Sequence, residues 1–387
     1  MAVSAQPPSR QGESAGYLAS QIITCIGNKR ALLPFLGTGV DMVKRTLGKD
    51  RISFFDAFSG SGIVSRYMKR HASLIVANDL ERYSEVVNRC YLTNRSSIDE
   101  KEFDGVFRRW TDHVRAHLSP GTISRLYAPR DDADIQPGER AFYTRENAMI
   151  LDSARDALDK VVPEKYFDLL LAPLLAEASV HVNTSGVFKG FYKNRRGIGA
   201  FGGEGRNALP RILGTIRLQK PVLSDFDCES IVLRGDANEV ARRIEPVDLA
   251  YFDPPYNQHP YGSNYFMLNL LAENRPPTRI SAASGIPAGW NRSRYNRRQE
   301  AEEALFELLG ATPARFLMVS CNSEGFIRKD RLLGFLGGLG RVTPLETAYR
   351  AFRGSRNLRR RPLTVTEYLF LVERTGSEPD NRGGSNA

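Results

Sequence analysis

Residues 51–79, RISFFDAFSGSGIVSRYMKRHASLIVAND, contain the pattern that determines the fold class. The apolar run 51–58 predicts a short buried strand, a turn with two glycines follows at 59–62, and residues 63–71 have the pattern of a helix. A second apolar strand covers 73–78 and is followed by Asp79. A strand, a turn, a helix and a strand in this order form a βαβ unit, which implies a parallel sheet.

Later segments extend this sheet. Three further apolar strands are expected at 230–234, 247–252 and 315–320. Residues 343–352 and 364–373 also have strand patterns, and the basic stretch 353–361 between them predicts an antiparallel hairpin. The sequence therefore predicts an α/β fold with a doubly wound, mostly parallel sheet and a C-terminal antiparallel hairpin that closes it.

A long insertion interrupts the strand pattern. Helical patterns cover 147–162 and 165–178, and a polar stretch rich in Gly, Lys and Arg follows over 183–206. Long polar insertions between sheet strands are usually functional or disordered. The expected division is a disordered leader over 1–16, a catalytic core of 17–99 and 216–374, an inserted, largely helical recognition region over 100–215, and a disordered tail over 375–387.

Composition narrows the class of protein. The 387 residues carry a formal net charge of +10, which suits a nucleic-acid partner, although a basic surface can also serve solubility alone. No apolar run approaches the roughly 18 residues of a membrane span, and the first 16 residues lack an apolar signal core. The four cysteines lack zinc or redox spacing, and His113 and His117 have no third ligand nearby. We therefore expect a cytoplasmic protein without a metal site.

The glycine turn and the next strand end suggest a nucleoside cofactor. Gly60 and Gly62 allow the backbone to approach a ligand at the carboxyl edge of the sheet, but Ser65 stands where a dinucleotide fingerprint needs a third small residue. Asp79 could accept hydrogen bonds from both ribose hydroxyls, and Asp236 could accept the amino group of an adenine. Each of these two aspartates could instead cap a helix.

The string Asp253-Pro254-Pro255-Tyr256, after an apolar strand, is the most specific feature. The two prolines donate no backbone hydrogen bonds and force a rigid extended turn. The Asp253 carboxylate and the Pro254 carbonyl could accept both hydrogens of an exocyclic amine, which would localise the lone pair of a poor nucleophile. Tyr256 offers a ring on which an extruded base can stack. The alternative is a structural turn.

These motifs, in this order, resemble those of the Dam-like (alpha-group) adenine-N6 DNA methyltransferases. The resemblance implies S-adenosylmethionine as the cofactor, with a loop lysine, here Lys29, near its methionine carboxylate. It implies cofactor contacts at Lys29, Asp56, Phe58, Gly60, Gly62, Asp79 and Asp236. It also implies that the catalytic residues are Asp253, Pro254, Pro255 and Tyr256.

The same resemblance extends to the insertion and to a later strand. Residues 183–188 are similar to a DNA-facing segment of the family, and residues 320–326 to a segment that follows catalysis. The expected DNA contacts are Asn183, Gly186, Lys189, Lys193, Arg195 and Arg196. A solvated basic loop is the alternative. A second candidate patch comprises Arg292, Arg294, Arg297 and Arg298.

The predicted function is methyl transfer from S-adenosylmethionine to the N6 amine of an adenine flipped out of double-stranded DNA, within a short specific sequence. The enzyme would act alone or beside a cognate restriction endonuclease, and its oligomeric state is left open. A base-amine methyltransferase of RNA, cytosine-N4 transfer and a non-catalytic DNA-binding module remain alternatives. A nicotinamide-dependent oxidoreductase is disfavoured by Ser65.

Overall fold

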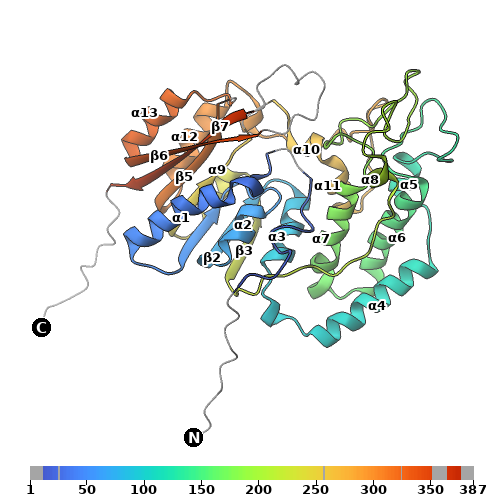
Figure 1. Cartoon of the computed structure of the whole chain (residues 1–387), viewed down its shortest axis with the longest axis horizontal. Coiled ribbons are helices and arrows are strands. Elements are labelled where there is room, and N and C mark those ends of the chain that lie inside the picture. Colours follow the sequence, from blue (N-terminus) through green and yellow to red (C-terminus); the bar gives the residue numbers. More distant parts are fainter. Residues whose placement is uncertain (1–11, 25–26, 256–257, 324, 351–363, 376–387) are drawn as a thin grey trace, which may run out of the picture.

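A computed structural model describes residues 12–24, 27–255, 258–323, 325–350 and 364–375, which contain one seven-stranded sheet in the order β3-β2-β1-β4-β5-β7-β6 (Figure 1). The strands are β1 (Ile52–Asp56), β2 (Ala72–Asp79), β3 (Glu229–Arg234), β4 (Val247–Phe252), β5 (Ala314–Asn322), β6 (Gly340–Arg350) and β7 (Thr364–Arg374). Strands β1 to β5 pair in parallel, whereas β7 pairs antiparallel with both β5 and β6. This arrangement confirms the predicted fold class.

Side chains that alternate between the two faces of the sheet divide the core around it into two layers. Phe54 and Leu249 are buried on the face covered by α1 (Leu33–Leu47) and α2 (Ile63–Met68). Their chain neighbours Phe55 and Ala250 are buried on the opposite face, because successive strand residues point to opposite sides. That second face is covered by α9 (Ala237–Ala241), α12 (Ala301–Ala311) and α13 (Lys329–Leu339). The helices therefore lie on both sides of the sheet.

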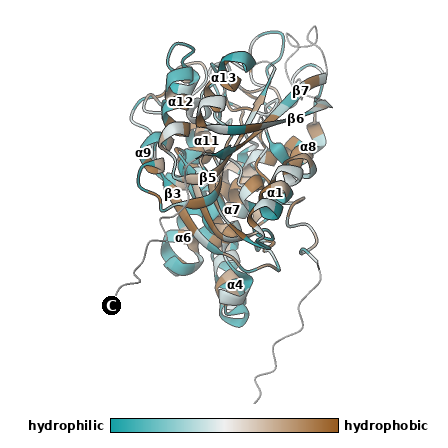
Figure 2. Ribbon diagram, turned by 90° about the vertical axis from the view of Figure 1, so that its left-hand side faces the viewer, coloured by the Kyte–Doolittle hydropathy of each residue, from teal (hydrophilic) through white to brown (hydrophobic). Residues whose placement is uncertain are grey.

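The insertion forms a separate helical layer, on the right in Figure 1. Its helices are α4 (Glu100–Ala116), α5 (Thr122–Leu126), α6 (Arg145–Val161), α7 (Glu164–Val180) and α8 (Leu209–Leu213). Asp99 and Thr144 cap the first turns of α4 and α6 by accepting hydrogen bonds from the N–H groups of Glu102 and Asn147. Figure 2 shows hydrophilic colouring over α4 and α6 and hydrophobic colouring along the central strands.

The helical layer also includes elements that the sequence placed in the catalytic core. It packs against α3 (Arg82–Leu92), and α11 (Phe266–Glu273) contributes buried residues to the same apolar cluster, next to α10 (Tyr261–Asn264). The shared interior includes Trp110, Leu170 and Phe266. The described residues also contain three short 3-10 turns: η1 (Lys29–Leu32), η2 (Arg95–Ser97) and η3 (Arg294–Asn296). The insertion thus packs on α3, which in turn packs against β2 and β3 of the sheet.

Three further expectations concern the ends of the chain, membrane-spanning segments and metal sites. Residues 1–11 and 376–387 lie outside the described residues, but Glu13, within the expected leader, accepts hydrogen bonds from the hydroxyl of Ser224. Among the described residues, no helix is long and apolar enough to cross a membrane. Within those ranges there is also no group of three or more His, Cys, Asp or Glu side chains that could hold a metal ion.

Candidate active site

Four aspartates come together at the carboxyl edge of the sheet. Asp56 ends β1, Asp79 ends β2, Asp253 follows β4 directly, and Asp236 lies two residues beyond β3. Because these strands are parallel neighbours in the order β3-β2-β1-β4, the four side chains line one pocket. The pocket contains about 920 Å³ of empty space, a figure that includes space open to solvent.

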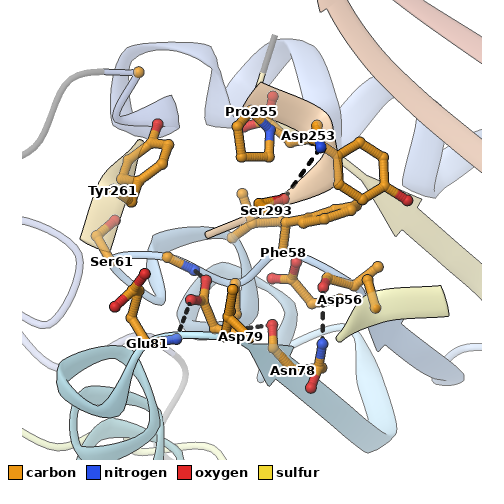
Figure 3. A pocket seen from close by; sticks show the side chains of 18 of the residues that line it. Asp56, Phe58, Ser61, Asn78, Asp79, Glu81, Asp253, Pro255, Tyr261 and Ser293 are labelled. Carbon is orange, nitrogen blue, oxygen red and sulfur yellow. Dashed lines mark hydrogen bonds between the residues drawn. The ribbon is translucent and has the colours of Figure 1, made fainter. Parts of the chain in front are cut away.

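Asp79 holds the glycine turn against the end of β2 (Figure 3). Its Oδ2 accepts a hydrogen bond from the N–H of Gly60 at 2.8 Å, and its Oδ1 accepts one from the N–H of Glu81 at 2.9 Å. Gly60 and Gly62 have φ values of +52° and +73°, which side chains rarely tolerate. The aspartate therefore fixes the turn and also lines the pocket.

Asp56 is buried beneath the turn. Its Oδ2 accepts a hydrogen bond from the Ser65 hydroxyl at 2.7 Å. Burial raises the pKa of Asp56 to about 7, and the charges of Asp253 and Asp79 act in the same direction, against the Ser65 hydrogen bond. Ser65, the residue that departs from the dinucleotide fingerprint, thus supports a carboxyl group in the pocket.

Asp236 caps a helix and also lines the pocket. Its Oδ1 accepts hydrogen bonds from the N–H groups of Asn238 at 2.9 Å and Glu239 at 3.3 Å, so it caps α9. It also lines the pocket, beside Ala237. Capping and ligand contact are compatible here, because both hydrogen bonds use the same carboxylate oxygen.

Asp253 is paired with a lysine within the pocket. Lys29 Nζ lies 2.9 Å from Asp253 Oδ1 and 3.2 Å from Glu367 Oε1. Burial raises the pKa of Asp253 to about 6; the ammonium of Lys29 opposes this rise and the charge of Glu367 adds to it. Asp253, Lys29 and Pro255 all line the pocket, whereas Tyr256 lies outside the described residues. The ion pair therefore belongs to the site.

Residues of the segment 257–300 cover the pocket from the opposite side. The Tyr295 ring packs edge-on against Phe58, with centroids 4.9 Å apart, and its hydroxyl donates to Asn238 Oδ1 at 2.6 Å. Ser293 and Tyr261 also line the pocket (Figure 3). The sequence analysis named only four arginines of this segment, as a candidate DNA-contact patch, so its contribution to the pocket was not foreseen.

Glu81 is another pocket residue that the sequence analysis missed. It is buried, and burial raises its pKa to about 7, with the charge of Asp79 adding to the rise. Its carboxylate accepts hydrogen bonds from the side-chain amides of Asn269 and, at 3.0 Å, Asn291. Its place two residues after the strand-ending Asp79 was the available signal, but both partners lie some 200 residues away in the chain.

The polar loop of the insertion has a buried anchor and an exposed basic part. The Asn183 side chain is fully buried; it donates to the carbonyls of Ala141 at 2.8 Å and Ala200 at 3.2 Å and accepts from the N–H of Gly202 at 2.9 Å. Gly186 adopts φ +114°. Phe188 is buried and donates its N–H to the carbonyl of Asn264 at 2.7 Å. Asn183 therefore holds the loop together from inside.

The basic residues that follow are at the surface. Lys189 is exposed, with its Nζ 3.4 Å from Nδ1 of His259, three residues beyond the tetrapeptide. Lys193 lies over the ring of Phe191, Arg195 pairs with Glu204, and Arg196 is exposed. In the second candidate patch, Arg294 pairs with Glu307 at 2.9 Å and Arg297 with Glu300 at 2.7 Å. Lys189 is thus an expected DNA contact that lies beside His259, a residue close to the tetrapeptide in the chain.

The sheet order, with antiparallel β7 between β5 and β6, and the acidic pocket at the carboxyl edge define a methyltransferase fold. The chain belongs to the D12 class N6 adenine-specific DNA methyltransferases, whose family model matches residues 26–283. This membership confirms the predicted class of enzyme and the resemblance on which the prediction rested.

Individual relatives are similar over most of the chain. It is 27% identical over 360 residues to the Type II methyltransferase M.NlaIII of Neisseria lactamica, covering 90% of this chain and 99% of that protein. It is 26% identical over 328 residues to the Type II methyltransferase M.CviAII of Paramecium bursaria Chlorella virus 1, covering 82% and 89%. The Modification methylase StsI of Streptococcus sanguinis is 26% identical over 362 residues, which are 90% of this chain and 51% of that protein.

Proposed function

We propose that this protein transfers the methyl group of S-adenosylmethionine to the N6 amine of an adenine turned out of double-stranded DNA. The observation that carries the proposal is the position of Asp253, whose carboxylate lines the same pocket as the glycine turn, Asp79 and Asp236. A group that can bind an amine therefore lies beside groups that suit a nucleoside cofactor.

The residues present fit that cofactor. Asp56 Oδ1 is buried without a hydrogen-bond partner among the described residues, which suits a cationic donor such as the ammonium of a methionine. Gly60 lines the pocket with φ +52°, a backbone conformation that residues with a Cβ rarely adopt. In our proposal Asp79 binds the ribose hydroxyls, Asp236 the adenine amino group, and Phe58 offers a ring face; Lys29 lies near the methionine carboxylate. When bound, the cofactor supplies a methyl group activated by the adjacent sulfonium charge.

The chain's own residues prepare the acceptor nitrogen. The carboxylate of Asp253 and the carbonyl of Pro254 each accept one hydrogen of the amine, which localises the nitrogen lone pair towards the methyl group. Because the pKa of Asp253 is about 6, its carboxylate is mostly ionised above neutral pH and can accept. Tyr256 would stack on the extruded base, whose unstacking costs a few kcal/mol.

Contacts to the DNA backbone are proposed for the basic loop. Lys189, Lys193, Arg195 and Arg196 would bind phosphates, with Lys189 next to the site of the flipped base. Asn183 and Gly186 would contribute by shaping this loop. We further propose that the enzyme acts in the cytoplasm, on a short DNA sequence and beside a cognate restriction endonuclease; the relatives named Type II methyltransferase and Modification methylase support a role in DNA modification.

Methylation assays with defined acceptors test the proposal. The purified protein and tritiated S-adenosylmethionine are incubated with duplex DNA from a methylation-free host or with total RNA, and modified bases are located by single-molecule sequencing of the DNA. We expect N6-methyladenine in a recurrent short DNA sequence. The Asp253→Ala variant should bind the cofactor in calorimetry yet transfer no methyl group, whereas Asp330→Ala, at an exposed site on α13, should behave as wild type. Labelling of RNA alone, or near-normal transfer by Asp253→Ala, would refute the proposal.

A further inference from the structure

Lys29 lies between two carboxylates that reach it from two different strands of the sheet. Asp253 follows β4 and is 2.9 Å from the ammonium, whereas Glu367 is on β7 and is 3.2 Å from it. The side chain of Glu367 is 0% exposed and that of Lys29 4%. The hydroxyl of Ser320 donates to the same Glu367 oxygen at 2.6 Å. Glu367 is thus locked in place behind the lysine.

This cluster has two carboxylates for one ammonium, although a single carboxylate would be enough to pair the buried lysine. One ammonium faces two carboxylates, so when all three groups are ionised the cluster has a net charge of −1 in a buried position. Buried ionised groups are costly unless they are paired, and a glutamine at position 367 would fill the same space and keep a contact to Lys29. The second carboxylate therefore calls for a functional explanation.

We propose that Glu367 is a positioning residue for methyl transfer: it holds Lys29 at Oδ1 of Asp253 and supplies the additional negative charge of the cluster. This inference rests on the proposed function. With Lys29 fixed at Oδ1, Oδ2 of Asp253 remains for the amine hydrogen. With the cofactor bound, the net negative charge would stabilise the positive charge that builds on the amine nitrogen as the nitrogen–methyl bond forms and the sulfur–methyl bond breaks; the neutral thioether would be the leaving group, and the nitrogen would then lose one proton.

The rate of methyl transfer should fall at acidic pH, because the reaction requires Asp253 as a carboxylate. The titratable groups that face Asp253 are Lys29, Glu367, Asp56, Tyr251 and Cys321. The charge of Glu367 raises the pKa of Asp253 and that of Lys29 lowers it. Removal of the Glu367 charge should therefore move the acidic limb of the rate profile to lower pH, and removal of the Lys29 charge should move it to higher pH.

Single-turnover methyl transfer, measured between pH 5 and 9 with saturating cofactor and duplex DNA, tests this inference. We expect Glu367→Gln to lower the plateau rate at least about tenfold, a loss of about 1.4 kcal/mol of transition-state stabilisation, and to move the acidic limb to lower pH. Lys29→Met should also lower the plateau but move the limb to higher pH. The matched control is Glu373→Gln, on the same strand, where the carboxylate pairs at the surface with Arg315 and Arg341.

Several outcomes would overturn the inference. A Glu367→Gln profile that coincides with that of Glu373→Gln would do so, as would a Lys29→Met limb that stays in place or moves to lower pH. Thermal unfolding and cofactor calorimetry separate misfolding from a lost positioning role, and we expect Glu367→Gln to melt no lower than wild type. If Asp253→Ala is inactive while Glu367→Gln is normal, only this inference fails; if Asp253→Ala is active, the proposed function fails.

Discussion

The carboxylate of Asp79 and the backbone of Gly60 are joined by a hydrogen bond of 2.8 Å, which ties the end of β2 to the turn that follows β1. The other oxygen of Asp79 accepts the N–H of Glu81, at the start of α3. One side chain thereby connects two βα junctions at the pocket. A ligand that contacts Asp79 meets an acceptor whose position is already set on two sides.

Replacement of Asp79 by asparagine should therefore affect both stability and cofactor binding. An amide retains one acceptor oxygen and presents an NH2 group to the other backbone donor, which costs about 1–3 kcal/mol for the group left unsatisfied. We expect a lower melting temperature and a Kd for S-adenosylmethionine at least about tenfold higher, measured by calorimetry. Asp330→Asn, at an exposed site, serves as the control. Unchanged affinity would remove Asp79 from the cofactor site.

Asp56 should make stability depend on pH. Its folded-state pKa of about 7 is above the usual 3.8, so the stability that it contributes is present below pH 3.8 and is lost as the pH rises through 7. We expect Asp56→Asn to raise the melting temperature more at pH 8 than at pH 5, while it weakens cofactor binding. Differential scanning calorimetry at the two pH values checks this. Equal shifts at both pH values would contradict the prediction.

The glycine turn should not tolerate a side chain at position 62. Gly62 has φ +73°, and a Cβ there would come within 3.0 Å of Oδ1 of the buried Asn88. We expect Gly62→Ala to destabilise the protein by at least about 1–2 kcal/mol and to weaken cofactor binding. Gly310→Ala is the matched control, because that glycine lies in α12 with open space around its Cβ position, so alanine there should stabilise by about 0.5–1 kcal/mol. A harmless Gly62→Ala would show that the turn adapts.

Replacement of the buried Asn183 and replacement of the exposed Lys189 should impair the protein in different ways. Asn183→Ala removes three hydrogen bonds to backbone groups, two of them within the loop, so we expect faster proteolysis within residues 189–206 and weaker DNA binding with normal cofactor binding. Resistance to proteolysis and DNA binding equal to those of wild type would show that the loop keeps its structure without this side chain.

Lys189→Ala should leave stability unchanged and weaken DNA binding uniformly across sequences. If Lys189 binds a phosphate, the slope of log K against log salt should become smaller in magnitude by about one, as measured by fluorescence anisotropy. The control is Lys329→Ala, on α13, where the lysine pairs with Glu346. An unchanged slope would place the phosphate contact elsewhere.

The fold and the core of the pocket could be predicted from the sequence because they depend on local patterns. Apolar strands, the glycine turn and the strand-ending aspartates are each visible within a few residues. Once the strands are parallel, Asp56, Asp79, Asp236 and Asp253 must meet at one edge, which is the arrangement that the structure shows.

The positions of the other residues could not be predicted, because they depend on strand pairing and on contacts between segments that are far apart in the sequence. Glu367 reaches Lys29 only because β7 lies between β5 and β6 in a register that sets Glu367 opposite Asn322. Glu81 is held by two asparagines from a distant segment. Asn183 was expected to face DNA and is instead buried, since a polar side chain in a polar loop gives no local sign of the backbone groups that it will bind.

The position of β7 has a consequence for how the enzyme comes into being on the ribosome. Because β7 lies between two strands that precede it in the chain, β5 and β6 cannot reach their final separation until residues 364–374 have been synthesised. Glu367, which contacts Lys29, is on that same strand. If Glu367 acts as we propose, a nascent chain that has completed β1 to β6 would reach full activity only when β7 enters the sheet.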